Sequence, residues 1–407
     1  MRLLPPSNSW ARGLAQEWLE ELYRWFEANG TAGYDPFDLK AHPLFRRLQA
    51  RKWPRRASTV LGDLFPVLLR KCLGVPPTEN PKTHALLALG KLRLYQRHIR
   101  KEWLEEAEQH LEWLTQRAEP GFHGMCWGYP FDVTAAGMNT PAGTPVLVVS
   151  AIAGQAYHLA WEITGRQTHR DAVLSIAEFI RNDLPRMEDP DGRFCFGYTP
   201  QDRRRVHNAN LLAVEHLARA VTAGAPEAWF GGALPALAFT LAAQREDGAF
   251  PYGTWRAGDP HEPGLLSMVD HHHTGFVLRS LHALNTLRPG ADTGSALDLG
   301  WIYYRNRLLL PSGMPVGATG RYPVDIHACA EAVLCPSALA ERYRDAQLPA
   351  ALAMRWAWAH LRDPRSGGPW YREYPGFRSK IVYPRWGAAW MFRALAEFDF
   401  RFDTPPY

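Results

Sequence analysis

A segment with one layout recurs about every 60 residues along this chain of 407 residues, and this recurrence limits the fold more than any other feature. In each copy, a turn rich in glycine and aromatic residues leads to a polar residue and then to an amphipathic stretch rich in small residues. The clearest copies begin at His207, His273, His327 and Arg385, with equivalent points near His84 and Val149. The spacing predicts six units, each with a first helix that starts at one of these residues.

Each unit also holds a second stretch with helical periodicity and a wider polar face. Ala172, Ile176 and Phe179, for example, recur at three- and four-residue steps. The predicted second helices span residues 10–28, 101–117, 168–184, 226–243, 292–307 and 349–361. Strand-like patterns are short and fall in turns, as at residues 192–196.

A helical hairpin cannot bury its apolar face alone, so six of them must pack side by side. An open helical solenoid is one solution. A closed ring fits better, because there are six units and the glycine-aromatic loops all precede the small-residue helices and therefore gather at one end. We expect an all-α fold, an (α/α)6 toroid with short β-like turns at one mouth. It would be a single domain over residues 1–407, regular over 80–400 and less regular over 1–80.

Polar residues at the predicted helix starts make the loop-bearing mouth the place for chemistry. Unpaired N–H groups and positive potential at helix N-termini suit anionic or hydroxyl-rich ligands. We predict that His207, His273 and His327 act as acid/base groups in a common cavity and that Asp270 and Asp325 orient them. Two alternatives stay open: the aspartates are helix N-caps, or two carboxylates on opposite walls hydrolyse a glycosidic bond.

Aromatic and polar residues near the same helix starts are candidates for binding a substrate. The sixteen tryptophans are an excess, and they either fill a large core or line a cleft whose flat faces stack on sugars or shield a carbocation. Arg385, with Arg205 as a second candidate, would bind a carboxylate or phosphate. The loop 123–132 is read as a wall of the cavity, with Cys126 as a packing thiol. The predicted binding residues are Trp127, Tyr129, Asp132, Asn208, Asn210, His272, Tyr322, Tyr383, Arg385 and Trp386.

Composition argues against several classes of partner and cofactor. The net charge of +5 is diffuse and lacks the basic stripe of a nucleic-acid binder. No run of about 18 apolar residues exists to span a membrane, and the N-terminus does not resemble a signal peptide. Five cysteines without regular spacing argue against a disulfide framework. We expect a cytoplasmic protein without a cofactor.

We also predict no metal ion. Asp325, His327 and Cys329 alternate, but positions i and i+2 of a helix diverge, so one metal would not hold all three. Structural zinc usually shows paired cysteines at short spacing, which the sequence lacks.

Four motifs resemble a family of bacterial capsule and exopolysaccharide biosynthesis proteins. They are Trp127-Gly128-Tyr129-Pro130-Phe131-Asp132, Val206-His207-Asn208-Ala209-Asn210-Leu211-Leu212, His273-Thr274-Gly275-Phe276 and Tyr322-Pro323-Val324-Asp325-Ile326-His327. The family is labelled VpsJ-like, or loosely prenyltransferase and squalene-cyclase-repeat proteins, and the similarity covers about residues 80 to 400. More distantly, the ring is similar to N-acylglucosamine 2-epimerases, unsaturated glucuronyl hydrolases and glucuronyl C5-epimerases.

The resemblance, together with the polar mouth, implies a carbohydrate-active enzyme of polysaccharide biosynthesis. It would catalyse epimerisation, hydrolysis or elimination on a saccharide or a lipid-linked oligosaccharide. It would also associate peripherally with a synthesis complex. One alternative is a terpenoid-cyclase-like enzyme, although no Asp-x-Asp-Asp acid motif is present. The other is a non-catalytic sugar-binding or scaffold protein of that complex.

Overall fold

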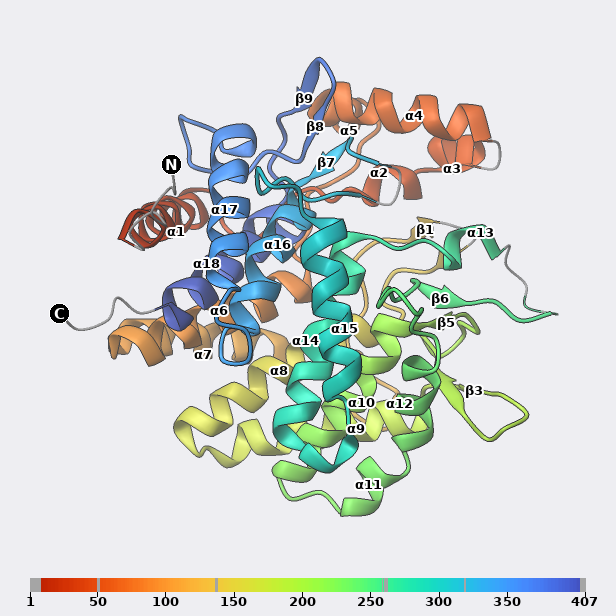
Figure 1. Ribbon diagram of the computed structural model, residues 1–407. Coiled ribbons are helices and arrows are strands. Elements are labelled where there is room, and N and C mark those ends of the chain that lie inside the picture. The colour runs from red at the N-terminus through yellow and green to blue at the C-terminus, as the bar shows by residue number, and fades with distance from the viewer. Residues whose placement is uncertain are drawn as a thin grey trace.

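Six helices that are buried on nearly every side form the inner wall of a ring. The computed structural model describes residues 9–49, 52–135, 138–257, 259, 263–317 and 320–402. Each inner helix packs against the next in chain order, and the last packs against the first, which closes the ring (Figure 1). The inner helices are α6 Pro81–His98, α8 Leu147–Thr164, α10 His207–Thr222, α14 His271–Leu287, α16 Ile326–Ala338 and α18 Ala389–Arg401.

The predicted second helices lie outside this wall with one face exposed. In the outer helix α7, only Ala107, Leu111 and Leu114 are buried, whereas α8 and α10 bury most of their residues. The outer helices are α1 Ser9–Asn29, α7 Lys101–Gln116, α9 Gln167–Asn182, α11 Glu227–Gly231, α12 Leu234–Leu241, α15 Gly294–Tyr303 and α17 Gln347–Leu361. The stretch 226–243 was predicted as one helix, but it forms two, α11 and α12. The helix α15 continues into a π-helical turn, Tyr304–Leu308. The chain is an (α/α)6 toroid, as the repeat predicted.

Glycines let neighbouring inner helices approach closely. A Cβ on Gly154 of α8 would overlap the ring of His216 on α10. A Cβ on Gly275 of α14 would overlap the side chain of Glu331 on α16. The small residues of the repeat are therefore a packing requirement of the inner wall.

The remaining elements are short and belong to the connections. Four small helices occupy the irregular N-terminal region: α2 Asp38–Ala41, α3 Pro43–Gln49, α4 Lys52–Leu64 and α5 Pro66–Cys72. Figure 1 shows them at the top, beside β7, β8 and β9. The strands are β1 Val133–Ala135, β2 Met138–Thr140, β3 Arg186–Glu188, β4 Phe194–Phe196, β5 Arg205–Val206, β6 Gly253–Thr254, β7 Val324–Asp325, β8 Arg372–Tyr374 and β9 Phe377–Ser379. Three further short segments are α13 Pro263–Leu266, a 3-10 turn at Pro289–Ala291 and a π-helical turn at Pro384–Ala388.

Two of the strand pairs fix where inner helices begin. β5 pairs antiparallel with β6 and runs directly into α10. β7 pairs with β8, placing Asp325 opposite Arg372, and runs directly into α16. The loops therefore hold the N-termini of these inner helices in defined positions at one mouth.

Two further expectations concern cysteines and the membrane. All five cysteines are free thiols, and four of them are buried. Within the described part of the chain, no helix combines the length and the apolar character that crossing a membrane requires.

Candidate active site

The start of α14 places a carboxylate against a histidine. Asp270 has an extended backbone, and its Oδ1 accepts a hydrogen bond from the backbone N–H of His273 at 2.8 Å, which caps the helix. Its Oδ2 lies 2.7 Å from Nδ1 of the same histidine. The two roles that the sequence offered as alternatives, capping and orienting, therefore occur together. With Nδ1 taken by the carboxylate, Nε2 is the ring nitrogen left for other chemistry.

Two histidines from neighbouring inner helices lie in contact with each other. The rings of His272 on α14 and His327 on α16 are stacked with centroids 4.8 Å apart. His327 is 4% exposed, and neither of its ring nitrogens has a hydrogen-bond partner. The rings of Trp386 and Trp390 lie 4.6 Å and 4.7 Å from it. The side chains of His272 and His273 remain 22% exposed, so a ligand can reach this cluster from the mouth.

The sequence predicted that Asp325 orients the ring of His327. In the structure Asp325 caps the start of α16 and makes no hydrogen bond to that ring. Its Oδ1 accepts the backbone N–H of His327 at 2.8 Å and the indole N–H of Trp386 at 2.7 Å. Its Oδ2 accepts from Arg372 at 2.9 Å. Three donors occupy this carboxylate, because β7 and β8 bring Arg372 opposite it. Asp325 is a cap and a link between the loops.

A buried lysine and an arginine complete the polar part of the mouth. Nζ of Lys82, at the start of α6, donates to the hydroxyl of Tyr129 at 3.0 Å. The guanidinium of Arg385 lies over the Tyr129 ring, 5.1 Å from its centroid, and its Nη2 donates to Asp35 at 2.7 Å. Arg385 was predicted to bind a carboxylate or phosphate of the substrate, and in the structure the carboxylate of Asp35 already binds it. Arg205, the second candidate, pairs with Asp259 at 2.7 Å.

Burial keeps the imidazoles of His272 and His327 neutral. It lowers the pKa of His272 to about 4 and the pKa of His327 well below the ordinary value, and in His327 the nearby His272 adds to the effect. Burial also lowers the pKa of Lys82. Burial opposes the charged form of Asp270, yet the adjacent His272 and His273 prevail and hold its pKa below the usual range. The site therefore combines neutral bases with an ionised carboxylate.

His207 does not join the cluster, which corrects the sequence prediction. Its Nδ1 is hydrogen-bonded to Thr240 at 3.1 Å and its Nε2 to Thr254 at 2.9 Å, and its ring stacks on Phe239. It is fully buried, and burial lowers its pKa to about 3. The two hydrogen bonds tie the ring to α12 and to β6, so both nitrogens already have partners within the protein.

Three predicted binding residues are also structural. Asn210 accepts from Phe196 N and donates to Ala236 O, tying β4 and α12 to α10. Trp127 is fully buried and donates to Leu114 O. Tyr383 is buried beneath Arg70. Each sits at a helix start or in a glycine-aromatic loop, but its side chain points into the wall of the ring.

The other three predicted binding residues take no part in the hydrogen bonds and ring contacts that the structure describes for the histidine cluster. Asp132 accepts from Ala142 N at 3.0 Å, which links the segments that flank the β1–β2 pair. Asn208 is buried, and its Oδ1 has no hydrogen-bond partner. Tyr322 is 38% exposed.

The sequence reading missed Lys82 and Tyr252. Lys82 follows Asn80-Pro81, an N-cap and a proline at the first helical position, so aligning the cap instead of His84 would have revealed it. The ring of Tyr252 lies 4.4 Å from that of His273, because β6 pairs with β5 across the mouth. No local signal marks Tyr252, since its position depends on that pairing.

One group in the cluster has donors close enough for a metal ion. Ligand atoms of Asp270, His272 and His273 all lie within 4.8 Å of one another. The same Asp270 oxygens already accept from the backbone and ring of His273. A metal would therefore compete with the cap and with the oriented imidazole.

Solved structures of similar fold cover most of this chain. A cellobiose 2-epimerase from Bacillus thermoamylovorans B4167 covers 80% of this chain and 88% of its own, with a TM-score of 0.62 and 12% identity. A D-mannose isomerase covers 78% and 86%, with a TM-score of 0.56 and 13% identity. An unsaturated glucuronyl hydrolase specific for heparin covers 96% and 97%, with a TM-score of 0.59 and 11% identity. No protein-family model and no curated protein matches the sequence.

Proposed function

We propose that the protein is a carbohydrate-active enzyme that epimerises or isomerises a saccharide. One imidazole removes a proton from a carbon of the sugar, and a second imidazole returns a proton. The observation that carries the proposal is the histidine cluster, in which His327 has two unpartnered ring nitrogens and His273 is held by Asp270. Similar folds in a cellobiose 2-epimerase and a mannose isomerase support this choice of chemistry.

The two histidines fit complementary roles. Neutral His327 can accept the proton of a C–H bond next to a carbonyl, and the bonding electrons then move to the carbonyl oxygen to give an enediolate. Asp270 stabilises the imidazolium form of His273, which can return a proton to the opposite face of the same carbon. The product is the epimer, and solvent restores both histidines to their starting protonation states.

Neighbouring residues suit the remaining parts of a sugar. The hydrogen-bonded pair of Lys82 and Tyr129 can donate to the oxygen on which negative charge develops. The partly exposed rings of Tyr252 and Trp386 offer flat faces for the apolar side of a pyranose.

Other chemistries on this fold fit the site less well. Hydrolysis needs two available carboxylates, whereas Asp270 serves its own helix start and Asp325 accepts three hydrogen bonds. A terpenoid-cyclase reaction passes through a carbocation, which neutral imidazoles such as those of His272 and His327 would quench.

We place the substrate in bacterial capsule or exopolysaccharide synthesis, on the strength of the family resemblance at residues 80–400. The saccharide would be free or lipid-linked, and the protein would work in the cytoplasm beside the synthesis complex. A sugar-binding scaffold is the second candidate, because the same aromatic faces would bind a glycan without chemistry.

Incubation in heavy water tests the proposal. Reducing hexose disaccharides, mannose and uronic-acid oligosaccharides would each be incubated with the protein and followed by proton NMR. We expect loss of the signal from the hydrogen next to the carbonyl carbon, together with appearance of the epimer. The variant His327→Gln should show neither. Binding of a saccharide without exchange on any of them would favour the scaffold.

A further inference from the structure

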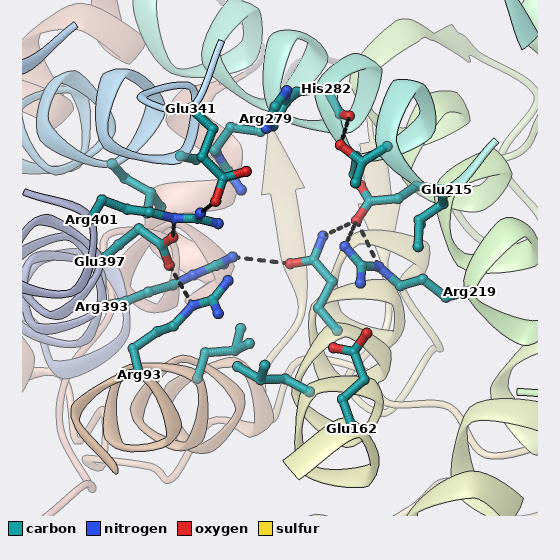
Figure 2. Close-up of a pocket in the computed structure, with 18 residues that line it drawn as sticks. Arg93, Glu162, Glu215, Arg219, Arg279, His282, Glu341, Arg393, Glu397 and Arg401 are labelled. Atoms are coloured by element: carbon teal, nitrogen blue, oxygen red, sulfur yellow. Dashed lines mark hydrogen bonds and ion pairs between the residues drawn. The ribbon is translucent and has the colours of Figure 1, made fainter. Parts of the chain in front are cut away.

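A cavity opens between the inner helices at the other end of the ring from the histidine cluster. Its volume is about 260 Å³, and all six inner helices contribute to its lining (Figure 2). It is distinct from the histidine cluster, whose residues lie at the opposite ends of the same helices. Nothing in the chemistry proposed for the mouth uses it.

Charged side chains dominate this axial cavity, and most of them are paired. Five arginines and four glutamates line it. Arg219 donates to Glu215 at 2.8 Å, and Arg279 donates to Glu331 at 2.7 Å. Figure 2 shows Glu397 between two further arginines, Arg93 and Arg401, and each of them donates to it at 2.9 Å. These four arginines therefore have carboxylate partners.

Arg393 is the exception. The residue is 9% exposed, and its Nη2 donates a hydrogen bond to the neutral amide of Gln155 at 3.1 Å. Nη1 is buried without a hydrogen-bond partner. Among the residues that the structure describes, no carboxylate forms an ion pair with it. Gln155 cannot supply charge, and its own Nε2 donates to Glu215.

An unpaired buried cation is costly, so its presence needs a reason. Cations in the last turn of a helix are stabilised by the helix dipole, which accounts for Arg401 but not for Arg393, which lies in the first half of α18. Burial, and then the like charge of Arg279, lower the pKa of Arg393 to about 9 against the opposing effect of the carboxylates of Glu397, Glu331 and Glu215, none of which forms an ion pair with it, so the group stays charged at neutral pH. The missing partner is a negative charge.

We propose that the axial cavity binds a small oxyanion, such as a phosphate or carboxylate group, against Arg393. The volume admits such a group with water, and Arg93, Arg219 and Arg279 line the same space. The guanidinium of Arg393 lies 5.6 Å from the ring centroid of Trp390, and that ring stacks on His327 at 4.7 Å. The anion site therefore backs onto the candidate active site through one tryptophan.

Inorganic phosphate is the probe for the test. The full chain would be titrated by calorimetry at neutral pH and constant ionic strength, with sodium chloride as the reference salt, and its Tm would be followed in parallel. We expect a saturable heat and a saturable rise in Tm with phosphate. Arg393→Gln should weaken binding by about tenfold or more and raise the Tm measured without phosphate. Arg355→Gln, the same change on the exposed side of α17, should bind like the wild type.

A second variant keeps the test decisive if Arg393→Gln fails to fold. Ala283 of α14 lines the cavity and is partly exposed, so Ala283→Glu would tether a carboxylate inside it. We expect a higher Tm without phosphate and loss of phosphate binding, whereas Ala283→Gln should leave the Tm without phosphate unchanged. The proposal is overturned if phosphate behaves like chloride with the wild type, or if Arg393→Gln and Arg355→Gln bind phosphate equally. No sugar enters this test, so its result is independent of the proposed enzymatic activity.

Discussion

The carboxylate of Asp270 is shared between the backbone and the ring of a single residue, His273. One oxygen caps α14 at 2.8 Å, and the other holds Nδ1 of the imidazole at 2.7 Å. Helix geometry makes this possible, because the N-cap residue faces the third residue of the first turn. A common capping arrangement thereby fixes the tautomer and the direction of a candidate catalytic group.

Replacing Asp270 by asparagine separates the two roles. The amide oxygen of Asp270→Asn can still cap the helix, but it carries no charge to stabilise an imidazolium at His273. We expect kcat to fall by about a hundredfold with little change in Tm, measured on the best saccharide from the exchange screen.

The matched comparison is Asp270→Ala, which removes the cap as well. It should lose a similar amount of activity and also about 1 kcal/mol of stability. Equal activity in the wild type and Asp270→Asn would show that the carboxylate acts on the helix alone.

His327 should be indispensable for catalysis if it is the base. Since general bases contribute about a hundredfold to ten-thousandfold, His327→Gln should lower kcat by that factor while saccharide binding persists. The control is His360→Gln on the outer helix α17, whose ring pairs with Glu373. Comparable losses in both variants would remove His327 from the mechanism.

The fold could be predicted from the sequence because every unit of the repeat has the same local pattern, a glycine-aromatic turn followed by an amphipathic helix. Helix periodicity placed the outer helices 101–116, 167–182 and 347–361 to within two residues. Closure also followed, since six copies with loops on one side leave few other arrangements.

The site followed only in part, because a helix start does not say where a side chain points. His207 and His273 occupy similar places in the repeat, yet Thr240 and Thr254 draw the ring of His207 into the wall. Tyr252 enters the mouth through a strand pairing between distant loops. Arg393 looks like any helix arginine in sequence, and only its buried Nη1, which has no hydrogen-bond partner among the described residues, sets it apart.

The buried histidines should make the protein sensitive to acid. The pKa of His207 is about 3 in the folded chain because of burial, against about 6.5 when unfolded. Above pH 6.5 this histidine is neutral in both states and does not lower the free energy of unfolding. As the pH falls from 6.5 toward 3, the free energy of unfolding decreases, since only the unfolded chain takes up the proton.

The variant His207→Gln isolates this contribution. Below about pH 6, its free energy of unfolding should fall less steeply than that of the wild type, by about 1.4 kcal/mol per pH unit. Denaturant unfolding at pH 7, 6 and 5 provides the measurement. Parallel curves for the two proteins would mean that the histidine is protonated in the folded state.

Removing metal ions should leave the activity intact. The donors of Asp270, His272 and His273 are close enough to bind a cation, but the proposed mechanism needs the same carboxylate to hold His273. We expect full activity after dialysis against a chelator and inhibition by added zinc. Loss of activity that zinc restores would instead assign these three residues to a metal centre.

The close contact between α8 and α10 gives the most direct test of the inner wall. An alanine at Gly154 would drive its Cβ into the ring of His216, which cannot swing away freely because its Nε2 is bonded to Val173 O at 3.0 Å. Overpacking of this kind costs about 1–3 kcal/mol, so Gly154→Ala should lower the free energy of unfolding by that amount.

Gly13→Ala is the matched control. Gly13 is exposed in α1 with no atom near the added methyl group, and the change should stabilise the helix by up to about 1 kcal/mol. Because both variants make the same chemical change in a helix, opposite signs isolate the packing of the ring. If Gly154→Ala were as stable as Gly13→Ala, α8 and α10 could not lie this close, and the inner wall that positions the histidines would have to be drawn differently.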